Sequence, residues 1–306
     1  MTAPPLLPPT LTLAAPAKVN LTLEVLRRRP DGFHDIRSVM QAINLADRLT
    51  FSRATTLELR CSRPELENLD NLVWRAAELL RRETGTAHGA RIDLQKRIPV
   101  AAGLGGGSSD AATALLGLNA LWGLRLQRPD LRDLGSRLGS DVPFFLGDSP
   151  CALAQGRGEQ LTPLTPLPMA WVVLVNPPLP IAAAEVYRGF PPHYWSDGSR
   201  TAAWLAASQT GTGVPSPFND LESVALTIAP SAGAARDALR SAGAPGAVMS
   251  GSGSTYFALF TGEAEARAVV ARLVRVAHAD SRVPPSAVFL ARFGPLAGDH
   301  GHNPRC

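Results

Sequence analysis

The sequence predicts an α+β protein of two domains, and three observations support this prediction. The chain has 306 residues, 45% of them hydrophobic, which exceeds one average domain and suits a large packed core. Stretches with a hydrophobic period of two, typical of strands, are interspersed with stretches whose apolar residues recur at three and four, typical of helices. A proline-rich stretch, 163–168, indicates the boundary. We therefore expect domains at 1–165 and 166–306.

The first domain is expected to begin with strands. Val19, Leu21, Leu23 and Val25 alternate with polar residues, and a Pro-Asp-Gly turn follows at 30–32. The strands predicted for this domain are 11–26, 39–49, 53–61, 90–95, 144–146 and 151–154. The helices predicted are 69–82, 109–121 and 131–138. In the helix at 109–121, four apolar residues form a buried stripe, and they are Ala111, Leu115, Leu118 and Trp122.

The second domain is expected to begin with a buried strand, since 171–175 is a continuous apolar run. The predicted strands are 171–175, 247–250, 256–260 and 287–293, and the predicted helices are 182–188, 220–228, 231–242 and 264–276. This order of elements is typical of a ferredoxin-like α+β unit. Residues 195–217 show little pattern and are interpreted as loop. A proline-rich lead-in at 1–10 and a disordered tail at 294–306 complete the prediction.

Composition narrows the classes of function. The net charge is only +4 and the basic residues are spread along the chain, so an anionic small substrate explains the bias as well as nucleic acid does. The three cysteines are widely spaced and form no zinc-binding pattern, which favours a reducing, cytoplasmic setting. No apolar stretch approaches the roughly 20 residues that a membrane span needs. Only two lysines occur, Lys18 and Lys96, against 28 arginines.

The most informative segment is a glycine-rich run that precedes the helix at 109–121. Four glycines within five residues let backbone N–H groups turn toward one anion, and two serines add hydroxyl donors. The free N–H groups at the start of the helix favour phosphate there, although a flexible, serine-capped loop is the alternative. No lysine lies in the run, so it is not a Walker loop. The predicted phosphate-binding residues are Pro99, Val100, Ala101, Ala102, Gly103, Leu104, Gly105, Gly106, Gly107, Ser108 and Ser109.

This run resembles the second signature of the GHMP kinases. The segments 16–21 and 251–254 resemble the first and third signatures, in the right order, and 31–34 and 139–144 resemble one branch of that family. The resemblance implies an N-terminal domain like ribosomal protein S5 domain 2 and a ferredoxin-like C-terminal domain. It also implies ATP as phosphoryl donor with Mg²⁺, and the 2-hydroxyl of a cytidine-diphosphate-linked methylerythritol as acceptor.

The resemblance further implies two catalytic residues, Asp141 as general base and Lys18 as charge stabiliser. Asp141 stands at a break before Pro143, where its side chain can project into a cleft, although a capping role is the alternative. A cation within about 4–6 Å would keep this carboxylate ionised. Asp110 is the rival carboxylate. We interpret it as a partner of the helix dipole, with contact to Mg²⁺ as the alternative, and no residue is assigned as a metal ligand.

Four residues are expected at the acceptor substrate. The resemblance places three of them near the cytidine, where Phe33 and Tyr187 are expected to stack on the cytosine and His34 to hydrogen-bond its edge. We expect Asn20 to orient the acceptor end. The family usually has Tyr at position 33, and Phe keeps the stacking face without the hydroxyl. Two other functions stay open. One is another GHMP kinase, of homoserine or mevalonate type, and the other is a non-catalytic nucleic-acid-binding module; no membrane partner is expected.

Overall fold

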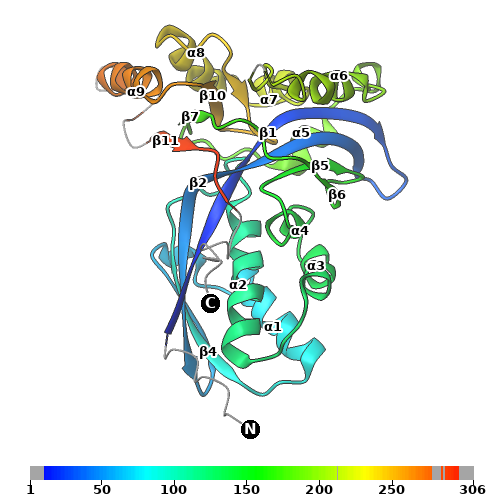
Figure 1. Ribbon diagram of the computed structural model, residues 1–306, viewed down its shortest axis with the longest axis vertical. Helices are drawn as coiled ribbons and strands as arrows, with labels where there is room; N and C mark the ends of the chain where they lie inside the picture. The colour runs from blue at the N-terminus through cyan, green and yellow to red at the C-terminus, as the bar shows by residue number, and fades with distance from the viewer. Residues whose placement is uncertain (1–9, 212, 278–283, 285–286, 296–306) are drawn as a thin grey trace.

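Two β-sheets with their helices make up the protein (Figure 1). The computed structural model describes residues 10–211, 213–277, 284 and 287–295. The predicted α+β class is confirmed. The expected lead-in before residue 10 and the expected tail from 296 onward lie outside the described residues. No helix in the described part of the chain is long and apolar enough to cross a membrane.

The first sheet has seven strands within the described ranges: β1 (Thr10–Arg28), β2 (His34–Ala54), β3 (Leu57–Cys61), β4 (Gly89–Gln95), β5 (Cys151–Gln155), β6 (Gln160–Pro163) and β8 (Phe218–Asn219). They follow the order β3-β4-β2-β1-β8, with β5 paired to β2 and β6 paired to β5. Strand β2 is longer than the predicted 39–49, because β1 supplies an antiparallel partner from its start to Ser52 and β4 pairs with its last residues. The predicted strand 53–61 is therefore divided, since its first two residues complete β2 and a turn precedes β3.

The pairing of β1 with β2 is interrupted by irregularities. Register shifts lie between Pro16 and Ala17 and between Asn20 and Thr22, so Lys18 and Asn20 occupy the short segment between them. Bulges of this kind bend a strand and redirect its side chains, and they are common beside active sites. Lys18 and Asn20 are buried polar residues in a strand that is otherwise mostly apolar at this point.

Helices on one side of the long strands form the main core of the first sheet (Figure 1). They are α1 (Leu72–Thr84), α2 (Gly106–Trp122), α3 (Arg128–Ser136) and α4 (Val142–Phe145), with a short 3₁₀ turn, η1 (Pro64–Leu66), before α1. The predicted apolar stripe of α2 is buried, as expected. The helix begins three residues before the predicted Ser109, inside the glycine run, because Gly105 adopts the left-handed conformation that precedes the first turn.

The second sheet has the order β11-β7-β10-β9, with every neighbouring pair antiparallel. Its strands are β7 (Trp171–Val175), β9 (Val248–Met249), β10 (Tyr256–Phe260) and β11 (Val288–Arg292). The helices described in this half of the chain are α5 (Ala183–Arg188), α6 (Ser199–Ser208), α7 (Glu222–Ile228), α8 (Gly233–Ser241) and α9 (Glu263–Ala277), with 3₁₀ turns η2 (Pro192–Tyr194) and η3 (Pro230–Ala232). Of these, α6 packs on β1 and β2 of the first sheet. Helices separate β7 from β9 and β10 from β11, which is the predicted ferredoxin-like order.

The predicted strand at 144–146 is wrong, because this segment belongs to the helical turn α4. Phe144 and Phe145 are both buried, and their rings meet edge to face with centroids 5.1 Å apart. A short apolar run buried on all sides has no periodicity that separates strand from helix. Pro143 lies in the first turn of the helix, a position that proline favours.

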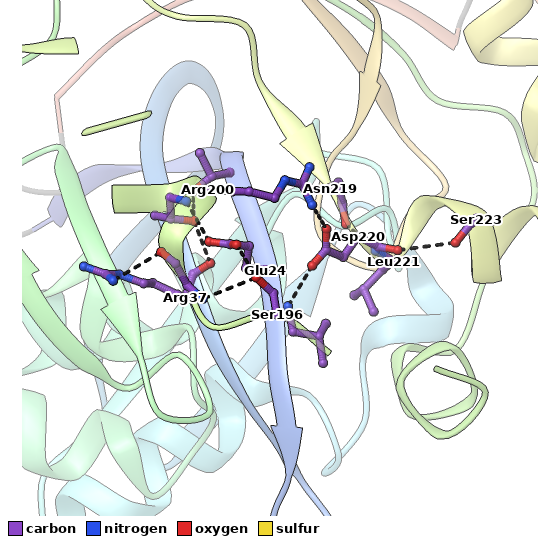
Figure 2. A network of polar contacts seen from close by, with 12 residues as sticks. Glu24, Arg37, Ser196, Arg200, Asn219, Asp220, Leu221 and Ser223 are labelled. Carbon is purple, nitrogen blue, oxygen red and sulfur yellow. Dashed lines mark hydrogen bonds and ion pairs between the residues drawn. The ribbon is translucent and has the colours of Figure 1, made fainter. Parts of the chain in front are cut away.

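The interpretation of 195–217 as loop is wrong for residues 199–208, which form α6. The start of α6 is stabilised by a residue far away in the sequence, Glu24 of β1. The Glu24 carboxylate accepts hydrogen bonds from the Thr201 N–H, at 2.7 Å, and from the Ser196 hydroxyl, at 2.5 Å (Figure 2). Asp197 adds a local contact, since it accepts from the Ser199 N–H at 2.9 Å, but the contacts from Glu24 on another strand leave no signal in the residues of the helix.

Strand β8 carries the second half of the chain into the first sheet. It pairs in parallel with β1, with Phe218 opposite Thr22 and Asn219 opposite Leu23. The next residue, Asp220, accepts a hydrogen bond from the Val25 N–H at 3.1 Å and pairs with Arg200 at 2.5 Å (Figure 2). The predicted domain boundary near residue 165 stays a prediction. Strand β8 follows that boundary in the sequence, yet it belongs to the first sheet.

Candidate active site

The glycine run lies against the second glycine-rich segment of the chain. A methyl group on Gly103 would lie 2.0 Å from the Ser250 carbonyl oxygen, and one on Gly251 would lie 2.9 Å from the Gly103 oxygen. The Ser250 hydroxyl donates to the same Gly103 oxygen at 3.0 Å. Gly103 and Gly251 both have positive φ angles. Glycine is therefore required at both positions by close approach as well as by backbone conformation.

Lys18 lies at the junction of these two segments. Its ammonium group donates to the Gly103 carbonyl oxygen at 3.0 Å and to Asn20 Oδ1 at 2.6 Å. The Asn20 amide in turn donates to the Ser38 hydroxyl at 2.8 Å, so Asn20 is fixed from both ends. Only 4% of Lys18 is exposed. This arrangement holds the ammonium in one place, with its remaining hydrogen-bonding capacity directed at the neighbouring cavity.

Asp141 is the carboxylate that faces this ammonium. Its Oδ2 lies 3.6 Å from Lys18 Nζ, and 34% of its side chain is exposed. Asp141 immediately precedes α4, yet its side chain caps no N–H of that helix. The alternative interpretation of Asp141 as a helix cap is therefore not what the structure shows. The structure brings together the two residues that the sequence indicated, Lys18 and Asp141, across more than a hundred positions.

A cavity of about 610 Å³ opens beside this pair, which we call the acceptor-side cavity. All four predicted substrate residues line it: Asn20, Phe33, His34 and Tyr187. The His34 and Tyr187 rings stack with centroids 5.6 Å apart. Burial, with a smaller effect of the positive charge of Arg28, lowers the pKa of His34, so its imidazole stays neutral. Enclosure of its hydroxyl, with the nearby negative charge of Asp141, raises the pKa of Tyr187.

Three cationic side chains of this cavity were missed by the sequence reasoning, namely Arg28, Arg157 and Arg188. The Arg157 guanidinium lies 4.9 Å from the centroid of the Phe33 ring, which is 52% exposed. Arginine is so frequent in this chain that no single one stands out. There is one weak signal for Arg28 in the sequence. This residue lies in a run of three arginines, 27–29, directly before the predicted turn at 30–32.

A second cavity, of about 430 Å³, lies on the other face of the glycine run, and we call it the nucleotide-side cavity. Gly103, Gly105 and Ser108 line both cavities, so the run forms the wall between them. Two predicted phosphate-binding residues line neither one. Leu104 is buried in the core, and Ser109 is buried inside α2. The sequence did not indicate five further lining residues as part of a binding site: Leu66, Asn68, Asp70, Asn71 and Leu72.

Lys96, the other lysine, closes the floor of the nucleotide-side cavity. Its ammonium group lies 2.5 Å from Asp47 Oδ2 and 2.6 Å from Asp110 Oδ2, and all three side chains are nearly inaccessible to solvent. Burial, with the negative charge of Asp47, acts to raise the pKa of Asp110, and the attraction of Lys96 opposes this effect. Burial acts to lower the pKa of Lys96, but the charges of Asp110 and Asp47 outweigh it and raise that pKa. The interpretation of Asp110 as a dipole partner missed this ion pair.

No group of three or more His, Cys, Asp or Glu side chains in the described part of the chain is arranged to hold a metal ion.

Comparison with known proteins decides the family. The GHMP kinases N terminal domain family matches residues 71–148, and the GHMP kinases C terminal family matches residues 202–279. The 4-diphosphocytidyl-2-C-methyl-D-erythritol kinase of Geobacter metallireducens is 45% identical over 271 residues, which are 84% of this chain and 92% of that protein. The chain belongs to the 4-diphosphocytidyl-2-C-methyl-D-erythritol kinase family of GHMP kinases. It is accordingly an ATP-dependent small-molecule kinase, and not a non-catalytic nucleic-acid-binding module.

Solved structures agree with this assignment. A crystal structure of 4-(cytidine 5'-diphospho)-2C-methyl-D-erythritol kinase is 38% identical and superposes with a TM-score of 0.78, covering 93% of this chain and 100% of that chain. A homoserine kinase from Cytophaga hutchinsonii is 17% identical, with a TM-score of 0.70 over 96% of this chain and 97% of that chain. The second likeness shows the fold alone. Together they confirm the two-domain GHMP kinase fold.

Proposed function

We propose that the protein transfers the γ-phosphoryl group of ATP to the 2-hydroxyl of 4-diphosphocytidyl-2-C-methyl-D-erythritol, which yields the 2-phosphate and ADP. This would be a cytoplasmic step in the formation of isoprenoid precursors by the non-mevalonate route. The names of the relatives point to this acceptor. The observation on which the proposal rests is the pairing of Lys18 with Asp141 beside a cavity lined by stacked His34 and Tyr187.

The acceptor hydroxyl would lie between Asp141 and the glycine run. Phosphoryl transfer requires the donor and acceptor oxygens to be aligned and the negative charge on the moving group to be offset. Asp141 is open to the cavity and can accept the hydroxyl proton as the new O–P bond forms. The Lys18 ammonium, fixed by Asn20 and Gly103, faces the same space and offsets charge on the phosphoryl group.

The nucleotide would bind on the other side of the glycine run. Backbone N–H groups at the start of α2, and the positive end of its dipole, favour phosphate at Gly105 to Ser108. Magnesium supplies charge neutralisation when it accompanies the ATP phosphates. The chain's own candidate for contact with the ion is Ser108, which lines both cavities and offers the hard oxygen ligand that Mg²⁺ prefers.

The base of the acceptor would bind at the far end of the acceptor-side cavity. Phe33 and Tyr187 offer aromatic faces for a cytosine, and neutral His34 has an unpartnered, buried Nδ1 that can hydrogen-bond its edge. Asn20 acts through Lys18, because its amide oxygen accepts from Lys18 and its NH2 group donates to Ser38. The three arginines of this cavity suit the diphosphate of the proposed acceptor.

An ATP-consumption assay tests this proposal directly. ADP release is measured with purified protein, ATP and Mg²⁺, in separate reactions with 4-diphosphocytidyl-2-C-methyl-D-erythritol, homoserine, mevalonate and galactose. We expect turnover with the first acceptor alone, and phosphorus NMR of the product should show a new phosphomonoester on carbon 2. Turnover only with homoserine or mevalonate would overturn the acceptor assignment, and the kinase assignment would stand.

A further inference from the structure

The cluster of Lys96, Asp47 and Asp110 joins three elements that meet under the glycine run. Asp47 comes from β2, Lys96 directly follows β4, and Asp110 lies in the second turn of α2. The two contacts of the ammonium group measure 2.5 and 2.6 Å, and at most 5% of any of these side chains is exposed. We call this cluster the ionic brace. It is distinct from Lys18 and Asp141, which face the other cavity.

Asp47 holds the segment that leads into the glycine run. Its Oδ1 accepts hydrogen bonds from the backbone N–H groups of Arg97 and Ile98, the latter at 2.9 Å, while its Oδ2 pairs with Lys96. One carboxylate thus fixes three consecutive residues before Pro99. The entry of the glycine run is anchored to the central strand of the sheet by this single side chain.

Asp110 holds the exit of the same run. It lies four residues after Gly106, where α2 begins, and its Oδ2 bonds to the same ammonium. The glycine at 106 allows this contact, since a methyl group there would lie 3.0 Å from the Ile98 side chain and 3.4 Å from Lys96 Nζ. Lys96 therefore links the entry of the run, through Asp47, to its exit, through Asp110.

The brace also borders the place where the nucleotide is expected. Lys96 and Asp110 both line the nucleotide-side cavity, and Asp110 Oδ1 is buried without a hydrogen-bond partner. A buried polar atom without a partner is costly, and such atoms concentrate at functional sites. No atom of the brace lines the acceptor-side cavity. Its influence should therefore fall on the nucleotide and not on the acceptor.

We propose that Lys96, Asp47 and Asp110 are positioning residues that hold the glycine run in the shape that binds the ATP phosphates. They would set the affinity for nucleotide, while Lys18 and Asp141 set the rate of transfer. This inference rests on the kinase assignment and not on the identity of the acceptor.

The test compares two variants with a matched control. Lys96→Met leaves two buried carboxylates without their cation, which destabilises the fold. The double variant Lys96→Met/Asp110→Asn removes one of those charges as well. The control is Arg137→Met, which breaks the exposed ion pair of Arg137 with Glu83, away from both cavities. Circular dichroism and thermal melting establish which variants are folded.

Calorimetric titration with ATP, without any acceptor, is the primary measurement. We expect the Kd for ATP to rise at least about tenfold in the double variant, with kcat at saturating ATP and KM for the acceptor within about threefold of the parent. Arg137→Met should match the parent in all three. An unchanged Kd for ATP, or a fall in kcat with KM for ATP unchanged, overturns the proposal.

Asp47→Asn keeps the test decisive if neither Lys96 variant folds. Asparagine retains the oxygen that accepts from the Arg97 and Ile98 N–H groups, but the oxygen that faces Lys96 becomes an NH2 group, which has no charge and cannot accept from the ammonium. We expect a smaller rise in the Kd for ATP, of about three- to fivefold, again without a change in kcat. A Kd equal to that of the parent contradicts the brace. Since ATP binding is measured without acceptor, a wrong acceptor assignment cannot imitate either result.

Discussion

The two lysines of the chain lie on opposite faces of the glycine run, and each is paired with carboxylate. Lys18 pairs with one carboxylate, Asp141, at 3.6 Å, and that side chain is 34% exposed. Lys96 pairs with two, Asp47 and Asp110, at 2.5 and 2.6 Å, and both are almost fully buried. The same two kinds of chemical group thus occur in an open arrangement and in a closed one.

The two arrangements suit different roles. The open pair can take part in the reaction, and the closed cluster can stabilise the chain segments around it. A carboxylate that faces a cavity at moderate distance from its cation can receive a proton from a third molecule, since one side of it remains available. A buried carboxylate held in short contacts with its cation is not open to a proton from a substrate. The contact between the two charged groups instead holds together the chain segments to which they belong. We therefore expect substitutions on the Lys18 side to change kcat and those on the Lys96 side to change nucleotide affinity.

The largest effect should come from the open pair. Asp141→Asn keeps the shape of the side chain, removes the proton acceptor and should lower kcat on the order of 10²–10⁴ with little change in thermal stability, because Asp141 caps no helix. Steady-state kinetics and melting curves check this. Asp148→Asn, at an exposed carboxylate nearby, is the control and should be fully active. Turnover of Asp141→Asn within a few-fold of the parent would reject its role as base.

The second-largest effect should come from a substitution in the glycine run, which lies between the two lysines. Gly103→Ala places a methyl group 2.0 Å from the Ser250 oxygen at a residue with a φ of 74°, so the run must move. Because displacement of about 1 Å can cost 10²-fold in rate, we expect kcat/KM to fall on the order of 10² for both substrates. Gly246→Ala has open space around it and is the control. If both variants retain parental kcat/KM, the contact between the two glycine-rich segments has no bearing on catalysis.

The smallest effect should come from the far end of the acceptor-side cavity. Phe33→Ala removes an aromatic face and should raise KM for the acceptor about two- to tenfold with kcat nearly unchanged, as expected for the ~0.5–1.5 kcal/mol of one aromatic contact. Phe33→Tyr restores the residue usual in the family and should stay within about twofold. Initial rates at varied acceptor concentration distinguish the two. A Phe33→Ala enzyme with parental KM would remove Phe33 from the substrate site.

The open pair could be predicted from the sequence, and the closed one could not. Lys18 and Asp141 each stand in a local signature, so the residues around them indicate their place. Lys96 stood out only as one of two lysines, and Asp47 gave no signal, because their association depends on how β2, β4 and α2 pack. The same reason explains α6, whose start is capped by Glu24 from β1. Interactions between distant segments leave no pattern in either segment.

Strand β8 has a consequence for how such proteins can be recombined. Its two residues belong to the first sheet, and the Asn219 amide also donates to the carbonyl oxygens of Met249 and Gly251, at 2.8 and 2.7 Å. A chimera joined near residue 165 would combine β1 from one parent with β8 and the second glycine-rich segment from another. The contacts between residues of different parents would then lie beside Lys18, next to Gly251. Strands β1 and β8 and the second glycine-rich segment should therefore come from one parent, although the two sheets look separable in Figure 1.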